Sequence, residues 1–185
     1  MLKSNDMATS GPYVIMVAVI SANGKLTRGS DADIYKWTSK EDQGFFFKLI
    51  EQSKLIVMGS GTYEAVRKQL KTQNKKLRIV LTSSPEKYKN EQIKGQLEFT
   101  SETPRQLYDR MIDHPKMLLV GGSKIYSSFA KEGLIDEIYI TIEPVVFGKG
   151  KNLFARGEFE SRLELLSAKK LNKKGTLLLK YRVIR

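Results

Sequence analysis

Asp42 is the carboxylate with the clearest chemical potential in this sequence. It lies five residues after Trp37, the single tryptophan, and shortly before Phe45-Phe46-Phe47. A carboxyl group walled by aromatic side chains keeps its proton to a higher pH and can donate that proton to a heterocycle. The alternative is an acid that faces water in the first turn of a helix, three residues after an N-cap at Ser39. The spacing leaves both interpretations open.

Two glycine-rich junctions each follow an apolar run and precede a helical segment. Their sequences are Met58-Gly59-Ser60-Gly61-Thr62 and Val120-Gly121-Gly122-Ser123-Lys124. Free backbone N–H groups at a helix start, together with hydroxyl groups, form a cradle for phosphate. A tight turn without a ligand is the alternative at each junction. Neither junction matches a Gly-Lys-Ser/Thr phosphate loop or the Gly-x-Gly-x-x-Gly fingerprint, so any nucleotide binding is expected to be of another type.

The composition and the charge narrow the remaining chemistry. The 185 residues include no cysteine and one histidine, His114, which excludes thiolate nucleophiles, zinc–cysteine sites and iron–sulfur clusters. The formal net charge of +12 favours anionic small-molecule ligands. Because the basic residues are scattered, we do not expect nucleic acid as a partner. Lys75, Lys76 and Arg78 are expected at a solvated edge; the alternative is that Lys76 contacts a carboxylate of the substrate.

The length and the patterning predict one globular domain over residues 12–185, after a disordered lead-in at residues 1–11. No apolar run reaches the roughly 18 residues that a membrane span needs. We therefore expect no membrane partner and a cytoplasmic location. Both a monomer and a homodimer are compatible with the sequence.

Apolar runs alternate with helical segments along most of the chain. The runs predict strands at 14–20, 54–59, 77–82, 97–100, 116–120, 135–142, 163–166 and 176–184. Helical spacing and cap residues predict helices at about 39–52, 63–70, 103–111 and 124–130. This order predicts an α/β three-layer sandwich with a mixed, mostly parallel central sheet and antiparallel C-terminal strands. Ligands bind at the carboxyl ends of such strands, where both glycine junctions fall.

Six segments occur in a fixed order along residues 13–184. They are Val17-Ala18-Val19-Ile20 with the loop Asn23-Gly24-Lys25-Leu26, Trp37-x-x-x-x-Asp42, Ile56-Val57-Met58-Gly59-Ser60-Gly61-Thr62-Tyr63, Ile79-Val80-Leu81-Thr82-Ser83, Val120-Gly121-Gly122-Ser123-Lys124-Ile125-Tyr126 and Ile138-Tyr139-Ile140-Thr141. Together they resemble the dihydrofolate reductase superfamily, which includes the reductase domain of bacterial riboflavin biosynthesis. The resemblance implies a dihydrofolate reductase-like fold and an NADPH-dependent oxidoreductase that acts on a pterin or a pyrimidine.

The resemblance also implies roles for individual residues. Asp42 would be the catalytic acid that holds the heterocycle, with Thr141 as its hydrogen-bonding neighbour and Trp37 positioning the ordered water of the site. Met16 and one of Phe46 or Phe47 would wall the substrate. NADPH would be held by Ala18 and Leu26 beside the nicotinamide and by the following residues along its phosphates and ribose: Gly59, Ser60, Gly61, Thr62, Leu81, Thr82, Ser83, Val120, Gly121, Gly122, Ser123, Lys124, Ile125 and Tyr126.

The sequence departs from the family pattern at several positions. Ser60, Ser123 and Lys124 stand where the family has arginine, glycine and arginine. Counting back from Gly59 places Gln43 at the position of the acid, whereas counting from Trp37 places Asp42 there. We select Asp42, because a carboxyl group supplies the needed chemistry and an amide does not.

Two substrates and one non-enzymatic role remain open. The main expectation is hydride transfer from NADPH to dihydrofolate, which gives tetrahydrofolate. The segment from Glu143 to Phe154 is more similar to the riboflavin-pathway reductase, so the alternative is reduction of a ribosylaminopyrimidinone 5′-phosphate. The alternative from another class is a nucleotide- or nucleic-acid-binding module without catalysis, which the net charge of +12 would favour.

Overall fold

The computed structural model describes residues 11–31 and 33–185. The predicted lead-in therefore lies, except for Gly11, outside the described residues. The elements, with η for a 3-10 helix, are β1 (Tyr13–Ser21), η1 (Ile34–Lys36), α1 (Lys40–Gln52), β2 (Leu55–Gly59), α2 (Ser60–Val66), β3 (Leu77–Leu81), η2 (Pro85–Glu91), β4 (Leu97–Thr100), α3 (Pro104–Arg110), β5 (Lys116–Leu119), α4 (Ser123–Lys131), β6 (Glu137–Glu143), β7 (Arg162–Lys170) and β8 (Leu177–Ile184).

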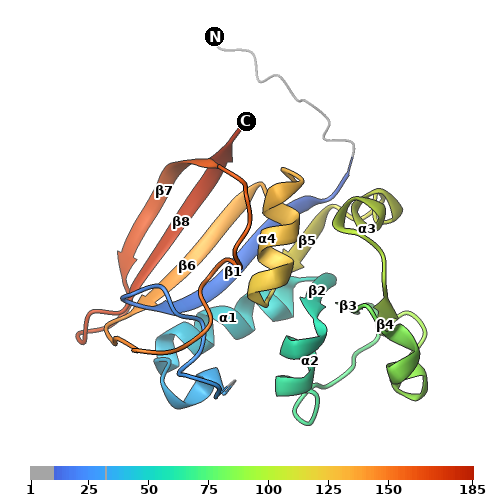
Figure 1. Cartoon of the computed structure of the whole chain (residues 1–185), viewed down its shortest axis with the longest axis horizontal. Helices are drawn as coiled ribbons and strands as arrows, with labels where there is room; N and C mark the ends of the chain where they lie inside the picture. The colour runs from blue at the N-terminus through green and yellow to red at the C-terminus, as the bar shows by residue number, and fades with distance from the viewer. Residues whose placement is uncertain (1–10, 32) are drawn as a thin grey trace.

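One mixed sheet organises this part of the chain (Figure 1). Its eight strands lie in the order β4-β3-β2-β5-β1-β6-β8-β7. Neighbouring strands are parallel, except that β8 runs antiparallel to both β6 and β7. The predicted mixed sheet with antiparallel C-terminal strands is confirmed. Within the described ranges, no helix is long and apolar enough to cross a membrane.

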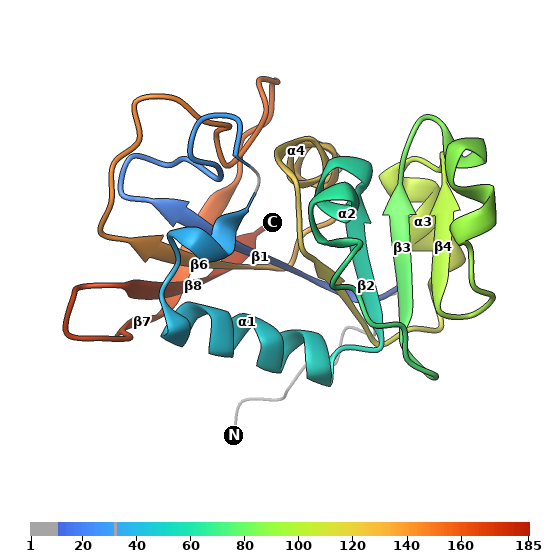
Figure 2. The ribbon, with the colours of Figure 1, turned by 90° about the horizontal axis from the view of Figure 1, so that it is seen from below.

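Helices cover both faces of the sheet, which gives the three layers. The strand β1 is buried on both sides, because Met16 belongs to one apolar cluster and Val17 to the other. Leu107 of α3 and Phe129 of α4 pack in the first cluster, and Leu49 of α1 packs against the second. Figure 2 shows α1 and α4 on opposite sides of β1. The predicted α/β three-layer sandwich is therefore confirmed.

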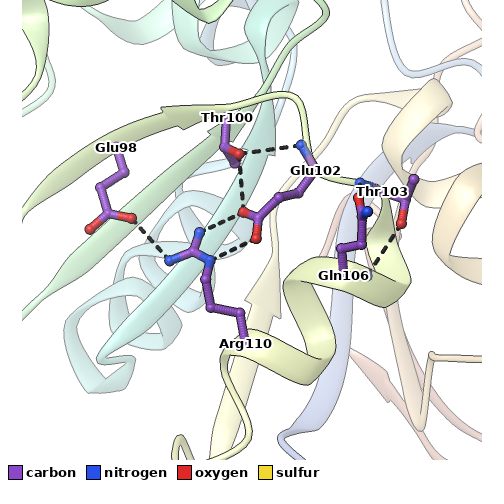
Figure 3. A network of polar contacts seen from close by, with 6 residues as sticks. All are labelled: Glu98, Thr100, Glu102, Thr103, Gln106 and Arg110. Carbon is purple, nitrogen blue, oxygen red and sulfur yellow. Dashed lines mark hydrogen bonds and ion pairs between the residues drawn. The ribbon is translucent and has the colours of Figure 1, made fainter.

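The predicted start of α3 is confirmed in detail (Figure 3). The Thr103 hydroxyl accepts a hydrogen bond from the Gln106 backbone N–H, and the Gln106 side chain accepts one from the Thr103 N–H, which completes a capping box. Arg110, at the end of the helix, makes a two-pronged contact with Glu102 and a further contact with Glu98 of β4. These contacts anchor α3 to β4 at the edge of the sheet.

The chain after β6 returns beside the loop that follows β1. The Leu26 N–H donates to the Lys151 carbonyl at 2.7 Å, and the Ala22 N–H donates to the Val145 carbonyl at 2.8 Å. Gly150 approaches this loop so closely that a Cβ atom there would collide with the Thr27 carbonyl. The 143–154 segment therefore holds the β1 loop, and Leu26 with it, in a fixed position.

Several predicted boundaries differ from those in the structure. The predicted helix at 63–70 is instead α2, Ser60–Val66. It begins directly after Gly59, so the residues predicted as a loop, Ser60 to Thr62, form its first turn. The helices η1 and η2 had no counterpart in the prediction. The predicted strand at 163–166 is part of the longer β7.

The expectation of a solvated edge is wrong for Lys76 and Arg78. Their exposed fractions are only 8% and 7%. The Lys76 ammonium donates to the carbonyls of Ile50, at 2.6 Å, and Glu51, at 3.1 Å, in the last turn of α1. A cation at this end of a helix satisfies carbonyls that have no partner within the helix and interacts favourably with the helix dipole. The tertiary position of α1, which residue spacing does not reveal, explains the burial of Lys76.

Candidate functional site

A cleft of about 630 Å³ opens at the carboxyl ends of the parallel strands. The start of α1 forms one wall, and the turns after β2 and β5 form the opposite wall. Eighteen of the residues predicted for the site line it: Ala18, Leu26, Asp42, Phe46, Gly59, Ser60, Gly61, Thr62, Leu81, Thr82, Ser83, Val120, Gly121, Gly122, Ser123, Lys124, Ile125 and Tyr126. Segments far apart in the sequence thus meet at one concave surface.

Asp42 is a buried acid at the wall of this cleft. Its exposed fraction is 5%. The pKa of its carboxyl group is raised from 3.8 to about 6, and burial is the largest cause. A hydrogen bond from Thr141 lowers the pKa, and the negative charge of Glu143 raises it. A carboxyl group with this pKa exchanges its proton near neutral pH, as acid–base catalysis requires.

Glu143 explains why Asp42 does not act as a simple helix cap. The Ser39 hydroxyl accepts the Asp42 N–H at 3.2 Å, so Ser39 is the predicted N-cap. In a capping box the side chain of Asp42 would accept the Ser39 N–H in return. That N–H instead donates to Glu143 at 2.7 Å, and the other Glu143 oxygen accepts the Thr176 hydroxyl at 2.7 Å. The interpretation of Asp42 as a capping acid that faces water is therefore wrong.

Gln43, the other candidate for the position of the acid, has a different environment. It also lines the cleft. Its side-chain amide donates to the Thr38 carbonyl at 3.1 Å, to the Thr38 hydroxyl at 3.1 Å and to the Tyr35 carbonyl at 3.3 Å. These bonds hold the segment around η1 against α1. The amide thus shapes the rim of the cleft, and the acid beside it is Asp42.

The two glycine turns lie directly against each other. The Gly59 N–H donates to the Gly121 carbonyl at 2.8 Å. Gly121 has φ +126°, in the region that favours glycine, and is joined to Gly122 by a cis peptide bond. A Cβ atom on Gly121 would stand 3.0 Å from the Thr62 hydroxyl oxygen. Glycine at this position therefore permits both the backbone conformation and the close approach of the turns.

Both helices that start at these turns lack a side-chain cap. Gly59 is the N-cap of α2 and Gly122 that of α4, and neither N-cap makes a side-chain hydrogen bond. The first N–H groups of a helix have no partner within the helix, and they carry a partial positive charge. With the hydroxyls of Thr62 and Ser123 beside them, the paired turns offer donors that could hold phosphate groups.

Five of the predicted site residues lie outside the lining of the cleft. Met16 is fully buried in the core. Thr141 is also buried, and its side chain forms a hydrogen bond with Asp42. Trp37 packs edge-on against Phe147. Phe47 is 52% exposed and stacks on Tyr35. Lys76 caps the far end of α1, so the predicted contact of its ammonium with the substrate is wrong for this structure.

Other residues at the site were not selected from the sequence. Tyr35, Gln69 and Lys151 line the cleft, and Glu143 lies behind Asp42. Glu143 and Lys151 belong to the segment that resembles the riboflavin-pathway reductase, and this was the one available signal. Tyr35 and Gln69 stand in polar stretches without a motif.

An eight-stranded mixed sheet, with a buried acid across a cleft from two paired glycine turns, defines an α/β protein of the dihydrofolate reductase-like class. The family model described as the RibD C-terminal domain matches residues 12–177, and the chain belongs to this family. The family is the dihydrofolate reductase-like reductase domain of riboflavin biosynthesis. The predicted resemblance is therefore confirmed. Of the two predicted substrates, the family favours the riboflavin-pathway compound, which was the alternative, over dihydrofolate, which was the main expectation.

One protein that is similar in sequence and two solved structures illustrate the similarity of this chain to known proteins. The uncharacterized protein YwjB of Bacillus subtilis is 27% identical over 163 residues, which cover 84% of this chain and 90% of YwjB. A putative riboflavin biosynthesis protein from Shewanella sp. PV-4 is 22% identical with a TM-score of 0.73, covering 94% of this chain and 99% of that one. A deaminase and 5-amino-6-(5-phosphoribosylamino)uracil reductase from Thermotoga maritima is 14% identical with a TM-score of 0.71, and the match covers 94% of this chain and 57% of that chain.

Proposed function

We propose that the protein is an NADPH-dependent reductase of a ribosylaminopyrimidine 5′-phosphate of the riboflavin pathway. The observation that carries the proposal is the juxtaposition of the buried Asp42 with the paired glycine turns across one cleft. Membership of the RibD C-terminal domain family supports the choice of substrate class. The net charge of +12 favours a phosphorylated substrate and a phosphorylated cofactor.

The cleft offers separate places for the cofactor and the substrate. The paired turns, with Thr82 and Ser83 after β3, would hold the phosphates and the adenosine ribose of NADPH. Ala18 and Leu26 would border the nicotinamide, which leaves the space beside Asp42 and Phe46 for the pyrimidine. When bound, NADPH supplies the hydride.

Asp42 would provide the proton that this reduction needs. When the sugar ring of a ribosylamino group opens, its first carbon forms a double bond to the amino nitrogen. Reduction of this bond adds a hydride to the carbon and a proton to the nitrogen. A carboxyl group with a pKa of about 6 carries that proton in about half of the molecules at pH 6 and in about a tenth at pH 7. Thr141 would orient the carboxyl group, and the charge of Glu143 behind it keeps the proton on Asp42.

Dihydrofolate is the second candidate substrate, and one observation favours it. A buried carboxylate with a threonine hydroxyl as its neighbour, here Asp42 and Thr141, is the pair that the resemblance assigns to pterin recognition. Its reduction would use the same hydride and the same proton donor. The two candidates therefore differ in the substrate that the cleft accepts.

A comparison of the two substrates tests the proposal. NADPH oxidation is measured with 5-amino-6-(5-phosphoribosylamino)uracil and with dihydrofolate, each also with NADH. We expect turnover of the phosphorylated pyrimidine with NADPH, and loss of most of that rate in Asp42→Asn. Glu41→Gln is the matched control, because this neighbouring acid is exposed and contacts Asn172. Turnover of dihydrofolate alone would select the second candidate, and NADPH binding without turnover of either substrate would contradict both.

A further inference from the structure

The short helix η2 follows the 82–84 loop, of which Thr82 and Ser83 line the cleft. It consists of seven residues of 3-10 helix, and its N-cap, Ser84, makes no side-chain hydrogen bond. Runs of 3-10 helix longer than three or four residues are uncommon, because their hydrogen-bond geometry is poor. Side chains from other elements must therefore hold η2 in its position.

Two tyrosine–glutamate hydrogen bonds join η2 to α2. The Tyr63 hydroxyl of α2 donates to Glu91 of η2, and the Tyr88 hydroxyl of η2 donates to Glu64 of α2 at 2.9 Å. The two bonds therefore link the same pair of elements in opposite directions. Tyr63 is only 3% exposed and Tyr88 only 4%. We call these four residues the tyrosine–glutamate latch.

Aromatic packing fixes the two phenol rings of the latch. Tyr88 stacks on Phe99 of β4 with ring centroids 4.6 Å apart, and Tyr63 meets the rings of Tyr88 and Phe99 edge-on, at 5.7 Å and 4.9 Å. Aromatic pairs prefer such arrangements. Arg67 also forms ion pairs with both glutamates of the latch, but these pairs are partly exposed. We therefore expect the buried hydroxyls to be the stronger part of the latch.

Both elements that the latch joins continue directly into the wall of the cleft. Tyr63 follows Ser60, Gly61 and Thr62, which line the cleft in the first turn of α2. The 82–84 loop lies between β3 and η2, and the N–H of its first residue donates to the Thr100 carbonyl at 2.9 Å. The sheet thus holds one end of this loop, and η2 holds the other.

We propose that Tyr63 and Tyr88 are positioning residues that hold the 82–84 loop against residues 59–62 and thereby set the affinity of the cleft for the adenosine end of NADPH. The inference rests on the proposed function, in which these two segments hold the phosphates and the adenosine ribose of the cofactor. Neither tyrosine belongs to the lining of the cleft, so both act through the segments that they join. A site loses affinity when its two halves are less well preorganised.

Variants that remove only a hydroxyl group test this role. Tyr63→Phe and Tyr88→Phe keep the aromatic rings, and NADPH binding to the full chain is measured by fluorescence titration. We expect the dissociation constant to rise at least fivefold in each variant. Tyr139→Phe is the matched control, because Tyr139 packs against the same apolar cluster and donates to Glu137 at 2.6 Å, but lies outside the lining of the cleft. It should change the dissociation constant less than twofold.

Variants of Glu91 separate the hydrogen bond from the packing. Glu91→Ala removes the acceptor of the Tyr63 hydroxyl, whereas Glu91→Gln keeps an oxygen that can accept it. We expect Glu91→Ala to weaken NADPH binding as much as Tyr63→Phe, and Glu91→Gln to bind within twofold of the wild type. The double variant Tyr63→Phe/Glu91→Ala should bind no more weakly than either single variant, because both changes remove the same bond. Adenosine 2′,5′-bisphosphate, the adenosine end alone, should lose affinity by the same factor as NADPH.

The outcomes distinguish this inference from the proposed function. NADPH binding at wild-type strength in Tyr63→Phe and Tyr88→Phe would overturn the inference alone. An equal loss in Tyr139→Phe would also overturn it, because the tyrosines would then support the fold in general. A loss for NADPH that adenosine 2′,5′-bisphosphate does not share would place the effect at another part of the cleft and overturn it too. A wild-type chain that does not bind NADPH would contradict the proposed function and this inference together.

Discussion

Two buried acids with different bonding meet at the start of α1. Both oxygens of Glu143 accept hydrogen bonds, one from the Ser39 N–H and one from the Thr176 hydroxyl. Asp42 is buried and has the Thr141 hydroxyl as the hydrogen-bond partner that lowers its pKa. Two neighbouring acids whose environments differ in this way can divide the work. Glu143 holds Ser39 and Thr176 in place and raises the pKa of Asp42, the acid that we propose as the proton donor.

The pH dependence of the reaction should follow the protonation of Asp42. Because the protonated acid is the proposed proton donor, we expect kcat/KM to be highest at low pH and to fall as the pH rises above about 6. In Asp42→Asn, we expect a loss of at least about 100-fold, the lower range for a general acid, and no inflection near that pH. Steady-state rates between pH 5 and 9 measure both effects. A wild-type profile that is flat through this range would contradict the role of Asp42 as the donor.

Asp42 should also reduce the stability of the fold at neutral pH. Its pKa is raised from 3.8 to about 6 on folding, so the folded state holds the proton more tightly than the unfolded state. The contribution of Asp42 to stability is therefore fully present below pH 3.8 and is lost as the pH rises through about 6. Since one pKa unit corresponds to about 1.4 kcal/mol, Asp42→Asn should gain up to about 3 kcal/mol of unfolding free energy at pH 8. Urea unfolding at pH 8 and near pH 4 measures this, and an equal difference at both values would contradict it.

The two turns depend on glycine at the element scale, and Gly121 is the clearest case. In Gly121→Ala, the new Cβ would meet the Thr62 hydroxyl oxygen at 3.0 Å while φ is +126°, so we expect a loss of about 1–3 kcal/mol in unfolding free energy and weaker NADPH binding. Gly44→Ala is the matched control. It lies within α1 with open space around its Cβ position, so it should gain about 0.5–1 kcal/mol. Urea unfolding and cofactor fluorescence titration compare them. Unchanged NADPH affinity in Gly121→Ala would separate this turn from the cofactor.

The order of the strands and helices could be predicted from the sequence more completely than the positions of single side chains. The order of strands and helices follows from apolar runs and from caps such as Thr103, because these signals are local. Most of the cleft could be predicted for the same reason, since its lining residues end strands or begin helices. Lys76 could not be placed, because the last carbonyls of α1 reach it through the tertiary fold. Glu143 is a similar case, because its closeness to Asp42 depends on the position of α1 beside the end of β6.

At the scale of the whole molecule, the positive charge and the cleft act together. The net charge is +12, and the two cationic residues in the lining of the cleft are Lys124, in the first turn of α4, and Lys151, in the segment after β6. Like charges that surround a cleft raise the local concentration of anions within it. This effect acts on the approach of the ligand and leaves the reacting groups unchanged.

Salt should therefore weaken substrate capture more than it slows the chemical step. The screening length falls from about 10 Å at 0.1 M to about 3 Å at 1 M salt, so kcat/KM for NADPH should fall several-fold over that range while kcat stays nearly constant. Lys124→Gln and Lys151→Gln should each reduce the slope of kcat/KM against salt concentration, because each removes a charge at the rim of the cleft. Lys94→Gln, an exposed position outside the lining of the cleft, should change the slope less. Equal slopes in all three variants would mean that the field of the whole surface, and not the charges at the rim, steers the anionic ligands.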